Sequence, residues 1–150
     1  MKTYVICVSK TFPKGHPKQG KPTFFKEGIL NGVNGDTTKY EYQHYKIHTI
    51  RANANLWKKR IFEVAKGNAV LSLREWEGTP YRSKQIEFLK LTNEHGVGIQ
   101  DIRIHPSSIA GGNTFNSYLW NYEFAGVIDR ETISNNDGLS VSEFTDWFFR

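Results

Sequence analysis

The stretch Lys46-Ile47-His48-Thr49-Ile50-Arg51 is the part of the sequence around which we expect the fold to be organised. Its β-branched residues predict a strand that carries an amine, a hydroxyl and a guanidinium within six positions. Because side chains alternate along a strand, Thr49 and Arg51 share one face, whereas Lys46 joins them only if the backbone bends or bulges. These groups suit an anion or a polar base, so the stretch predicts part of a binding site.

The composition indicates one globular domain spanning residues 1–150, with a net charge of +5. The only cysteine, Cys7, lies in an apolar run, which excludes a disulfide within the chain and a thiolate metal cluster and predicts a buried small hydrophobe. No apolar run approaches the ~20 residues of a membrane-spanning helix, and the first residues lack the layout of a signal peptide. We therefore expect a cytoplasmic protein with no membrane partner, no metal and no cofactor.

The positive charge is concentrated near the N-terminus, where residues 1–26 contain six lysines and no acidic residue. Prolines and glycines interrupt residues 10–26, so this segment cannot continue a helix or a central strand and is expected to be a basic surface loop. Nucleic acid phosphate is the expected partner, with Lys14, Lys18 and Lys21 as candidate contacts. The alternative is a flexible, solvated loop whose lysines only aid solubility.

The apolar periodicity predicts a mixture of strands and helices. Strands are expected over residues 3–9 (buried on both faces), 46–51, 69–76, 86–91 and 97–104. Helices are expected over residues 24–32 (ended by Gly32), from Asn53 or Asn55 to about Lys66 (ended by Gly67), and from a capping box of Ser140 and Glu143 onward. Residues 33–43 and 105–117 are expected to be loops, and residues 118–128 fit either a helix or a strand.

Two of the expected strands, 86–91 and 97–104, change their apolar face midway. A bulge, or a strand bent round a closed barrel, would produce that change. The pattern as a whole predicts an α+β fold, a small β-barrel of about five or six strands with two or three flanking helices.

The spacing Lys46-x-x-Thr49-x-Arg51 resembles the signature of the ASCH (activating signal cointegrator homology) domain, a small barrel of the PUA-like superfamily. Residues 24–32 are similar to the aromatic start and short helix of that family, residues 67–73 to the strand after its signature, and residues 136–148 to its last turn and helix. The resemblance covers residues 24–148 and implies a PUA-like barrel. The family's final strand has no counterpart after residue 148, so we predict that residues 2–9 take its place.

The resemblance also implies a chemistry. PUA-like barrels mostly bind RNA or modified bases, and some small ASCH proteins are amidohydrolases that remove the acyl group from acetylcytidine. Carried over, the amidohydrolase roles fall on Thr49 as nucleophile, Lys46 as proton acceptor and Asp137 as proton donor. A lysine accepts a proton only when desolvation or a neighbouring cation, such as Arg51, lowers its pKa.

We expect binding of RNA or a modified nucleotide beside this strand, with Arg51 and Trp76 as further contacts, because Trp76 lies beside a turn where it can stack on a base. The alternatives are an amidohydrolase, and an ASCH-type ribonuclease or a structural interaction domain. Each residue also has a structural alternative. Lys46 and Arg51 could be ordinary charges on an edge strand, Thr49 could be present for its β-branched side chain, and Asp137 could be a turn residue. His44 and His48 lie about 13 Å apart on a strand, too far for a shared metal.

Overall fold

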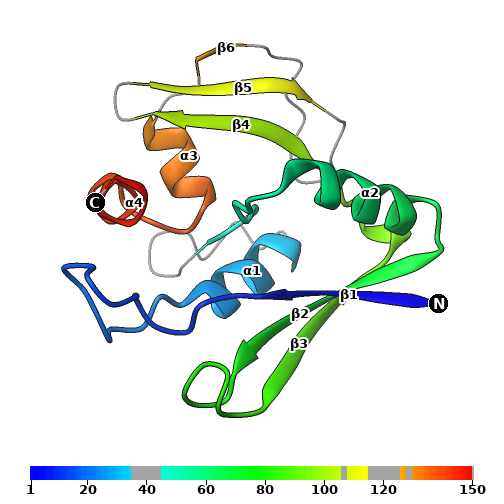
Figure 1. Ribbon diagram of the computed structural model, residues 1–150, viewed down its shortest axis with the longest axis horizontal. Coiled ribbons are helices and arrows are strands. Elements are labelled where there is room, and N and C mark those ends of the chain that lie inside the picture. Colours follow the sequence, from blue (N-terminus) through cyan, green and yellow to red (C-terminus); the bar gives the residue numbers. More distant parts are fainter. Residues whose placement is uncertain (35–44, 106–107, 115–125, 128–129, 150) are drawn as a thin grey trace. The chain divides into compact units, whose positions relative to one another are not determined.

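The computed structural model describes residues 1–34, 45–105, 108–114, 126–127 and 130–149 (Figure 1). It confirms the α+β class, with helices α1–α4 and strands β1–β6 in these ranges. The chain forms two compact units. The described residues of the first unit are 1–8, 51–101 and 113–114, and those of the second are 9–34, 45–50, 102–105, 108–112, 126–127 and 130–149. The described strands form two three-stranded sheets, and within these residues no closed barrel is shown.

The first unit is built on a sheet with the strand order β1 (Lys2–Cys7), β2 (Ala69–Trp76) and β3 (Gln85–Leu91). β1 pairs parallel to β2, which confirms that the N-terminal residues join a sheet. The prediction that β1 is buried on both faces is wrong, because its first residues are exposed. Among the described strands, β1 pairs only with β2. The central strand β2 is the buried one, from Ala69 through Leu73 without interruption.

The change of face predicted for residues 86–91 is a β-bulge. Leu73 pairs with Leu89 and Arg74 pairs with Glu87, so Phe88 is the extra residue on β3. A bulge inserts one residue and exchanges the two faces of the strand beyond it, which accounts for the sequence pattern.

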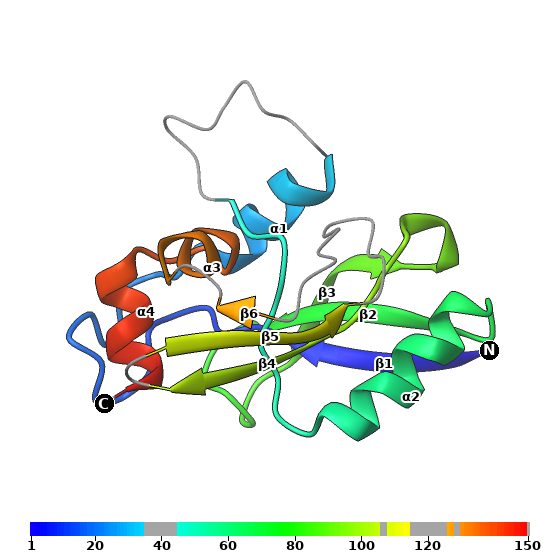
Figure 2. The same ribbon diagram turned by 90° about the horizontal axis from the view of Figure 1, so that it is seen from above.

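Helix α2 (Ala54–Ala65) contacts β2 and lies on one face of this sheet (Figures 1 and 2). It buries Ile61 and Val64, as its apolar spacing predicted. The predicted stop at Gly67 is confirmed, because this glycine takes the left-handed conformation with φ 81°. Of the two predicted starts, Asn53 takes the N-cap position, but its backbone is left-handed and its side chain makes no capping hydrogen bond.

The second unit contains α1 (Phe25–Asn34), α3 (Arg130–Asn136) and α4 (Val141–Phe148), and α3 contacts α4. A second sheet has the order β4 (Gln100–His105), β5 (Ser108–Thr114) and β6 (Gly126–Val127). The loop expected at residues 105–117 therefore contains a strand. Of the ambiguous segment 118–128, only residues 126–127 lie within the described part of the chain.

The C-terminal helix α4 begins at the predicted capping box. The hydroxyl of Ser140 accepts from the backbone N–H of Glu143 (3.1 Å), and the Glu143 carboxylate accepts from the backbone N–H of Ser140 (2.8 Å). Phe144 is fully buried, whereas Val141 is 40% exposed. This cap fixes the direction of α4, and the basic loop packs on that helix.

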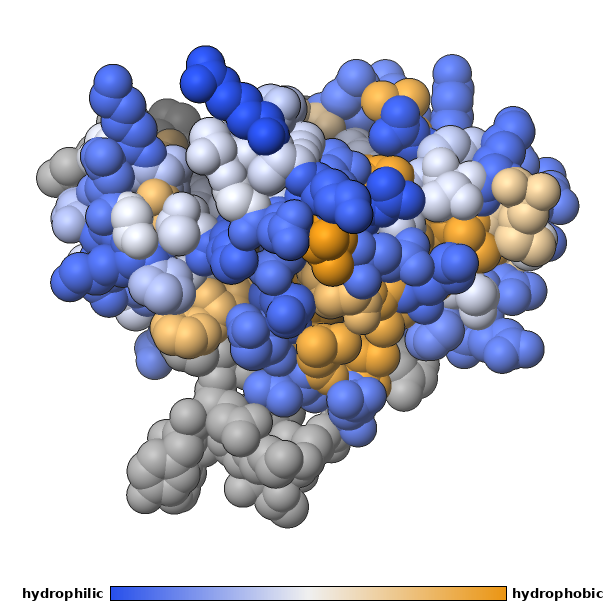
Figure 3. All heavy atoms as spheres, turned by 90° about the horizontal axis from the view of Figure 1, so that it is seen from below, coloured by the Kyte–Doolittle hydropathy of each residue, from blue (hydrophilic) through white to orange (hydrophobic). Residues whose placement is uncertain are grey.

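On the face drawn in Figure 3, hydrophilic residues border small groups of hydrophobic side chains. None of the helices in the described ranges has the length and apolarity that a bilayer crossing requires.

Candidate functional site

Residues 45–50 do not form the predicted strand; they belong to no helix and no sheet. Their backbone groups bond to helices instead. The N–H of Lys46 donates to the carbonyl of Gly28 in α1 (2.9 Å), and the N–H of Ile47 donates to the carbonyl of Asn136 at the end of α3 (2.9 Å). The segment is therefore held between α1 and the end of α3, which satisfies backbone groups that a sheet would otherwise pair.

Glycines allow the backbone at Lys46 to come this close. Gly28 and Gly32 lie four positions apart and so share one face of α1. A Cβ at Gly32 would lie 2.6 Å from the carbonyl oxygen of Lys46, and one at Gly28 would lie 3.1 Å from the Cβ of Lys46. A Cβ at Gly138 would also lie 3.1 Å from the Cβ of Lys46. The prediction that Gly32 ends α1 is therefore wrong. Gly32 lies inside the helix, at a place where a side chain has no room.

The amine of Lys46 is enclosed by three groups. Its Nζ lies 2.5 Å from Oδ1 of Asp137, donates to the backbone carbonyl of Asp137 (2.7 Å) and sits 4.2 Å from the centre of the Phe25 ring. Only 4% of the Lys46 side chain and 6% of the Asp137 side chain are exposed. Carboxylate, carbonyl and ring face all favour the charged ammonium, so Lys46 and Asp137 form a buried ion pair.

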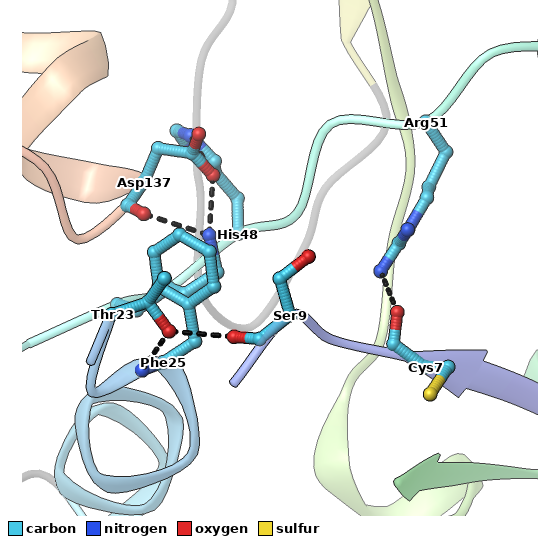
Figure 4. A network of polar contacts seen from close by, with 8 residues as sticks. Cys7, Ser9, Thr23, Phe25, His48, Arg51 and Asp137 are labelled. Carbon is cyan, nitrogen blue, oxygen red and sulfur yellow. Dashed lines mark hydrogen bonds and ion pairs between the residues drawn. The ribbon is translucent and has the colours of Figure 1, made fainter. Parts of the chain in front are cut away.

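Phe25 is positioned by Thr23, just ahead of α1. The Thr23 hydroxyl donates to the carbonyl of Ser9 (2.5 Å) and accepts from the backbone N–H of Phe25 (3.3 Å) (Figure 4). Phe25 was not predicted to contact Lys46. Its position three residues before Gly28 was the available signal, because that spacing puts both residues on the side of α1 that meets Lys46.

His48 lies beside the ion pair and was not predicted to be part of the site. Its Nε2 is 3.6 Å from Oδ1 of Asp137, which is too long for a hydrogen bond. Burial, together with the neighbouring Lys46 cation, lowers the pKa of His48 to about 3. The imidazole is therefore neutral near pH 7, and its contact with Asp137 is not an ion pair. Among the described residues, no three His, Cys, Asp or Glu side chains gather as a metal site requires.

The structure brings two of the predicted catalytic residues, Lys46 and Asp137, into direct contact. Thr49 belongs to the same segment and is half-buried. Arg51 and Trp76 belong to the first unit. There, the guanidinium of Arg51 donates to the carbonyl of Cys7 (2.9 Å), and Trp76, at the end of β2, is half-buried.

The basic loop is anchored by two buried side chains, Phe12 (5% exposed) and His16 (6% exposed). Their rings stack at 4.6 Å, and both rings lie against Trp147 of α4. Nδ1 of His16 accepts from the N–H of Lys18 (3.0 Å), so Nε2 carries the proton and donates to the carbonyl of Glu143 (3.1 Å). Nε2 of His16 thus attaches the loop to α4, while Nδ1 bonds within the loop itself.

The three candidate lysines of this loop are all exposed, as predicted, but they are not equivalent. The Lys18 amine lies 2.9 Å from the Glu143 carboxylate. Partial burial would raise the pKa of Glu143, but hydrogen bonds from the Ser140 N–H and from Lys18 outweigh it and lower that pKa. Glu143 offsets the charge of Lys18, whereas Lys14 and Lys21 present theirs to solvent.

A double-mutant cycle tests the buried ion pair. Asp137→Asn and Lys46→Met should each lower the free energy of unfolding by about 3–5 kcal/mol, because each leaves one buried charge without its partner. The double variant should lose clearly less than the sum, since neither charge remains. Denaturant unfolding of the four proteins measures this coupling.

The exposed pair provides a matched control. The cycle of Lys18→Met and Glu143→Gln should give a coupling of only about 0–1 kcal/mol, because water screens that pair. A coupling energy between Lys46 and Asp137 that is no larger than that of the control pair would contradict a buried ion pair.

Acidification should weaken the fold through His48. Its pKa is about 3 in the folded chain and returns to 6.5 on unfolding, so between these values the unfolded state binds more protons. Stability is complete above pH 6.5 and falls with the pH. At about 1.4 kcal/mol per pH unit, we expect a loss of about 2 kcal/mol between pH 7 and pH 5. Urea unfolding at several pH values should show a shallower dependence for His48→Gln, and identical slopes would refute a neutral, buried His48.

Comparison of the chain with protein-family models, with curated protein sequences and with solved structures found no significant match in any of the three. The ASCH resemblance therefore stays a prediction that rests on the motifs between residues 24 and 148. The chemistry of the Lys46–Asp137 cluster follows from its own geometry.

Proposed function

We propose that the protein binds RNA or a modified nucleotide, and that the basic loop of the second unit contacts the phosphate groups. The observation that carries this proposal is the anchoring of the loop. Phe12 and His16 are buried against α4, and Lys14 and Lys21 are exposed on the same loop. Positive charge held at a fixed place is what a phosphate backbone requires of its partner.

An anchored loop also favours binding on entropic grounds. A flexible loop has to be ordered when it meets its ligand, which costs about 0.5–1.5 kcal/mol for each side chain that is immobilised. Here the backbone around the lysines is already closed by hydrogen bonds, including Phe12 N–H to the Lys21 carbonyl (2.9 Å) and Gly20 N–H to the Phe12 carbonyl (3.1 Å). Only the lysine side chains remain to be ordered.

In this proposal, the amine of Lys46 in segment 45–50 does not bind the ligand, although its charge would suit an anion. The Lys46 ammonium is engaged by a carboxylate, a carbonyl and an aromatic ring, so it serves to position residues 45–50. Thr49, half-buried in that segment, is the group proposed to contact the base. Arg51 and Trp76 remain proposed contacts from the first unit, and the PUA-like barrel remains the proposed architecture.

Salt dependence tests the phosphate contacts. With a fluorescent single-stranded RNA of mixed sequence, affinity should fall as salt rises. The variant Lys14→Ala/Lys21→Ala should bind more weakly and lower the slope of log affinity against log salt by about 2, since each phosphate contact contributes about 1. Lys18→Ala should change the slope less, because Glu143 already offsets its charge.

Lys59→Ala is the matched control, since Lys59 is an exposed lysine on α2 of the first unit. It should leave both the affinity and the slope unchanged. If the loop variant kept the wild-type slope, the basic loop would not be the phosphate-binding surface.

Amidohydrolase activity is a second candidate, favoured by one observation: the predicted base and the predicted acid are in contact at 2.5 Å. As an ion pair, Lys46 has no lone pair with which to accept the Thr49 proton. Transfer of one proton from Nζ of Lys46 to Oδ1 of Asp137 would leave a neutral amine beside a carboxylic acid. The amine would then take the proton of Thr49 as its oxygen attacks the acyl carbon, and Asp137 would protonate the departing amine of cytidine, which leaves the acetyl group as an ester on Thr49. Hydrolysis of that ester by water would release acetate and restore the Thr49 hydroxyl.

Release of acetate from acetylcytidine tests this second candidate. Thr49→Ala should abolish the release and Thr49→Ser should retain part of it, because a serine hydroxyl can also attack. Wild-type protein that releases no acetate would remove the amidohydrolase and leave the binding proposal standing.

A further inference from the structure

We infer a second nucleic-acid contact in the first unit, at the tip of the β2–β3 hairpin. There Tyr81 stacks on an unpaired base, and Arg82 and Lys84 hold the flanking phosphates. The inference rests on the proposed binding of RNA, and it adds a surface and a ligand class, single-stranded nucleic acid.

The hairpin tip is an ordered turn that holds Tyr81 in place. The backbone N–H of Glu77 donates to the carbonyl of Lys84 (2.8 Å), which closes the end of the ladder. The Ser83 hydroxyl donates to the carbonyl of Thr79 (2.9 Å) and accepts from the N–H of Gly78 (3.0 Å).

Tyr81 occupies the tip at an energetic disadvantage. Its φ is 65°, the left-handed conformation that glycine adopts freely and that costs other residues about 1–2 kcal/mol. Its side chain is 89% exposed, so burial of the ring does not offset this strain. A strained residue with an exposed aromatic ring points to a role in contact with a ligand.

The surroundings of Tyr81 match the chemistry of single-stranded nucleic acid. Its ring centre lies 5.2 Å from that of Trp76, at an interplanar angle of 49°, so the half-buried tryptophan supports the exposed ring. Residues 78–85 carry two exposed cations, Arg82 and Lys84, and no acid, while Glu77 lies at the base of the turn. Stacking platforms flanked by cations bind unpaired bases, whereas the bases of a duplex are not available to stack on a side chain.

Two other aromatic residues of the described ranges are exposed: Phe24, in the second unit, is also left-handed (φ 59°) but only 43% exposed, and Phe62 has no positive φ. Phe62, also in the first unit, is 58% exposed, but the Lys66 amine lies over its ring at 4.2 Å. It therefore provides the matched control for a loss of aromatic surface elsewhere on the same unit.

Binding of a short oligoadenylate, followed by tryptophan fluorescence and checked by calorimetry, tests the inference. Tyr81→Ala should weaken binding by about fivefold to a hundredfold, the range measured for loss of one base–aromatic stack. Tyr81→Phe and the control Phe62→Ala should bind like the wild type. Tyr81→Gly should bind as weakly as Tyr81→Ala while unfolding at no lower temperature, because glycine relieves the strained φ, so weak binding cannot be attributed to a damaged fold.

Comparison of the Tyr81→Ala variant with the Lys14→Ala/Lys21→Ala variant separates the two proposals. If Tyr81→Ala matches the wild type while the lysine variant weakens binding, the stacking site is refuted and the basic loop stands. If Tyr81→Ala weakens binding while the lysine variant has no effect, the loop is refuted and the stacking site stands. The stacking site is also refuted if the wild-type protein binds longer mixed-sequence RNA but no oligoadenylate. It is refuted as well if the hairpin tip contacts a protein partner and Tyr81→Ala leaves the affinity for RNA unchanged.

Discussion

The buried ion pair between Lys46 and Asp137 is the interaction on which the second unit depends. It links the extended segment 45–50 to the turn that follows α3, and the backbone bonds of Lys46 and Ile47 fix the same segment to α1 and α3. A buried pair adds little stability beyond what an apolar pair of the same volume would give. The pair instead fixes position, because each buried charge is stabilised by the opposite charge of its partner. That constraint determines where Thr49 and His48 lie.

The pair was accessible from the sequence in part. The resemblance to the ASCH signature implied one site for Lys46 and Asp137, and the structure places them in contact although they are 91 positions apart. The strand predicted for residues 46–51 is wrong for a physical reason. Alternating β-branched residues favour an extended backbone, but whether that backbone pairs with a strand or with helix carbonyls depends on distant partners. Gly32 was misassigned for the same reason, because its lack of a side chain serves a contact and not a helix end.

The basic loop shows a similar division between local and distant information. Its lysines, prolines and glycines predicted a surface loop correctly, because those properties are local. Its attachment to α4 depends on Phe12 and His16 meeting Trp147 and Glu143, which lie near the other end of the chain. Phe12 stands directly before Pro13, and His16 lies between Pro13 and Pro17. Two isolated side chains give no periodicity that would predict such contacts. The β-bulge at Phe88, in contrast, was one of the two alternatives that the sequence predicted, because a bulge reverses a periodic pattern.

The unfolding free energy of Gly32→Ala tests the central claim most directly, because two effects predict opposite signs. Alanine in place of a glycine inside a helix stabilises it by about 1 kcal/mol when the site is open. Here the new Cβ would lie 2.6 Å from the Lys46 carbonyl oxygen and would displace segment 45–50 from α1. The account predicts a net loss of about 1–3 kcal/mol, while Gly78→Ala, whose Cβ would meet Ser83 at 3.6 Å, stays close to the wild type. A Gly32→Ala protein as stable as the wild type, or more stable, would contradict the close packing of Lys46 on α1.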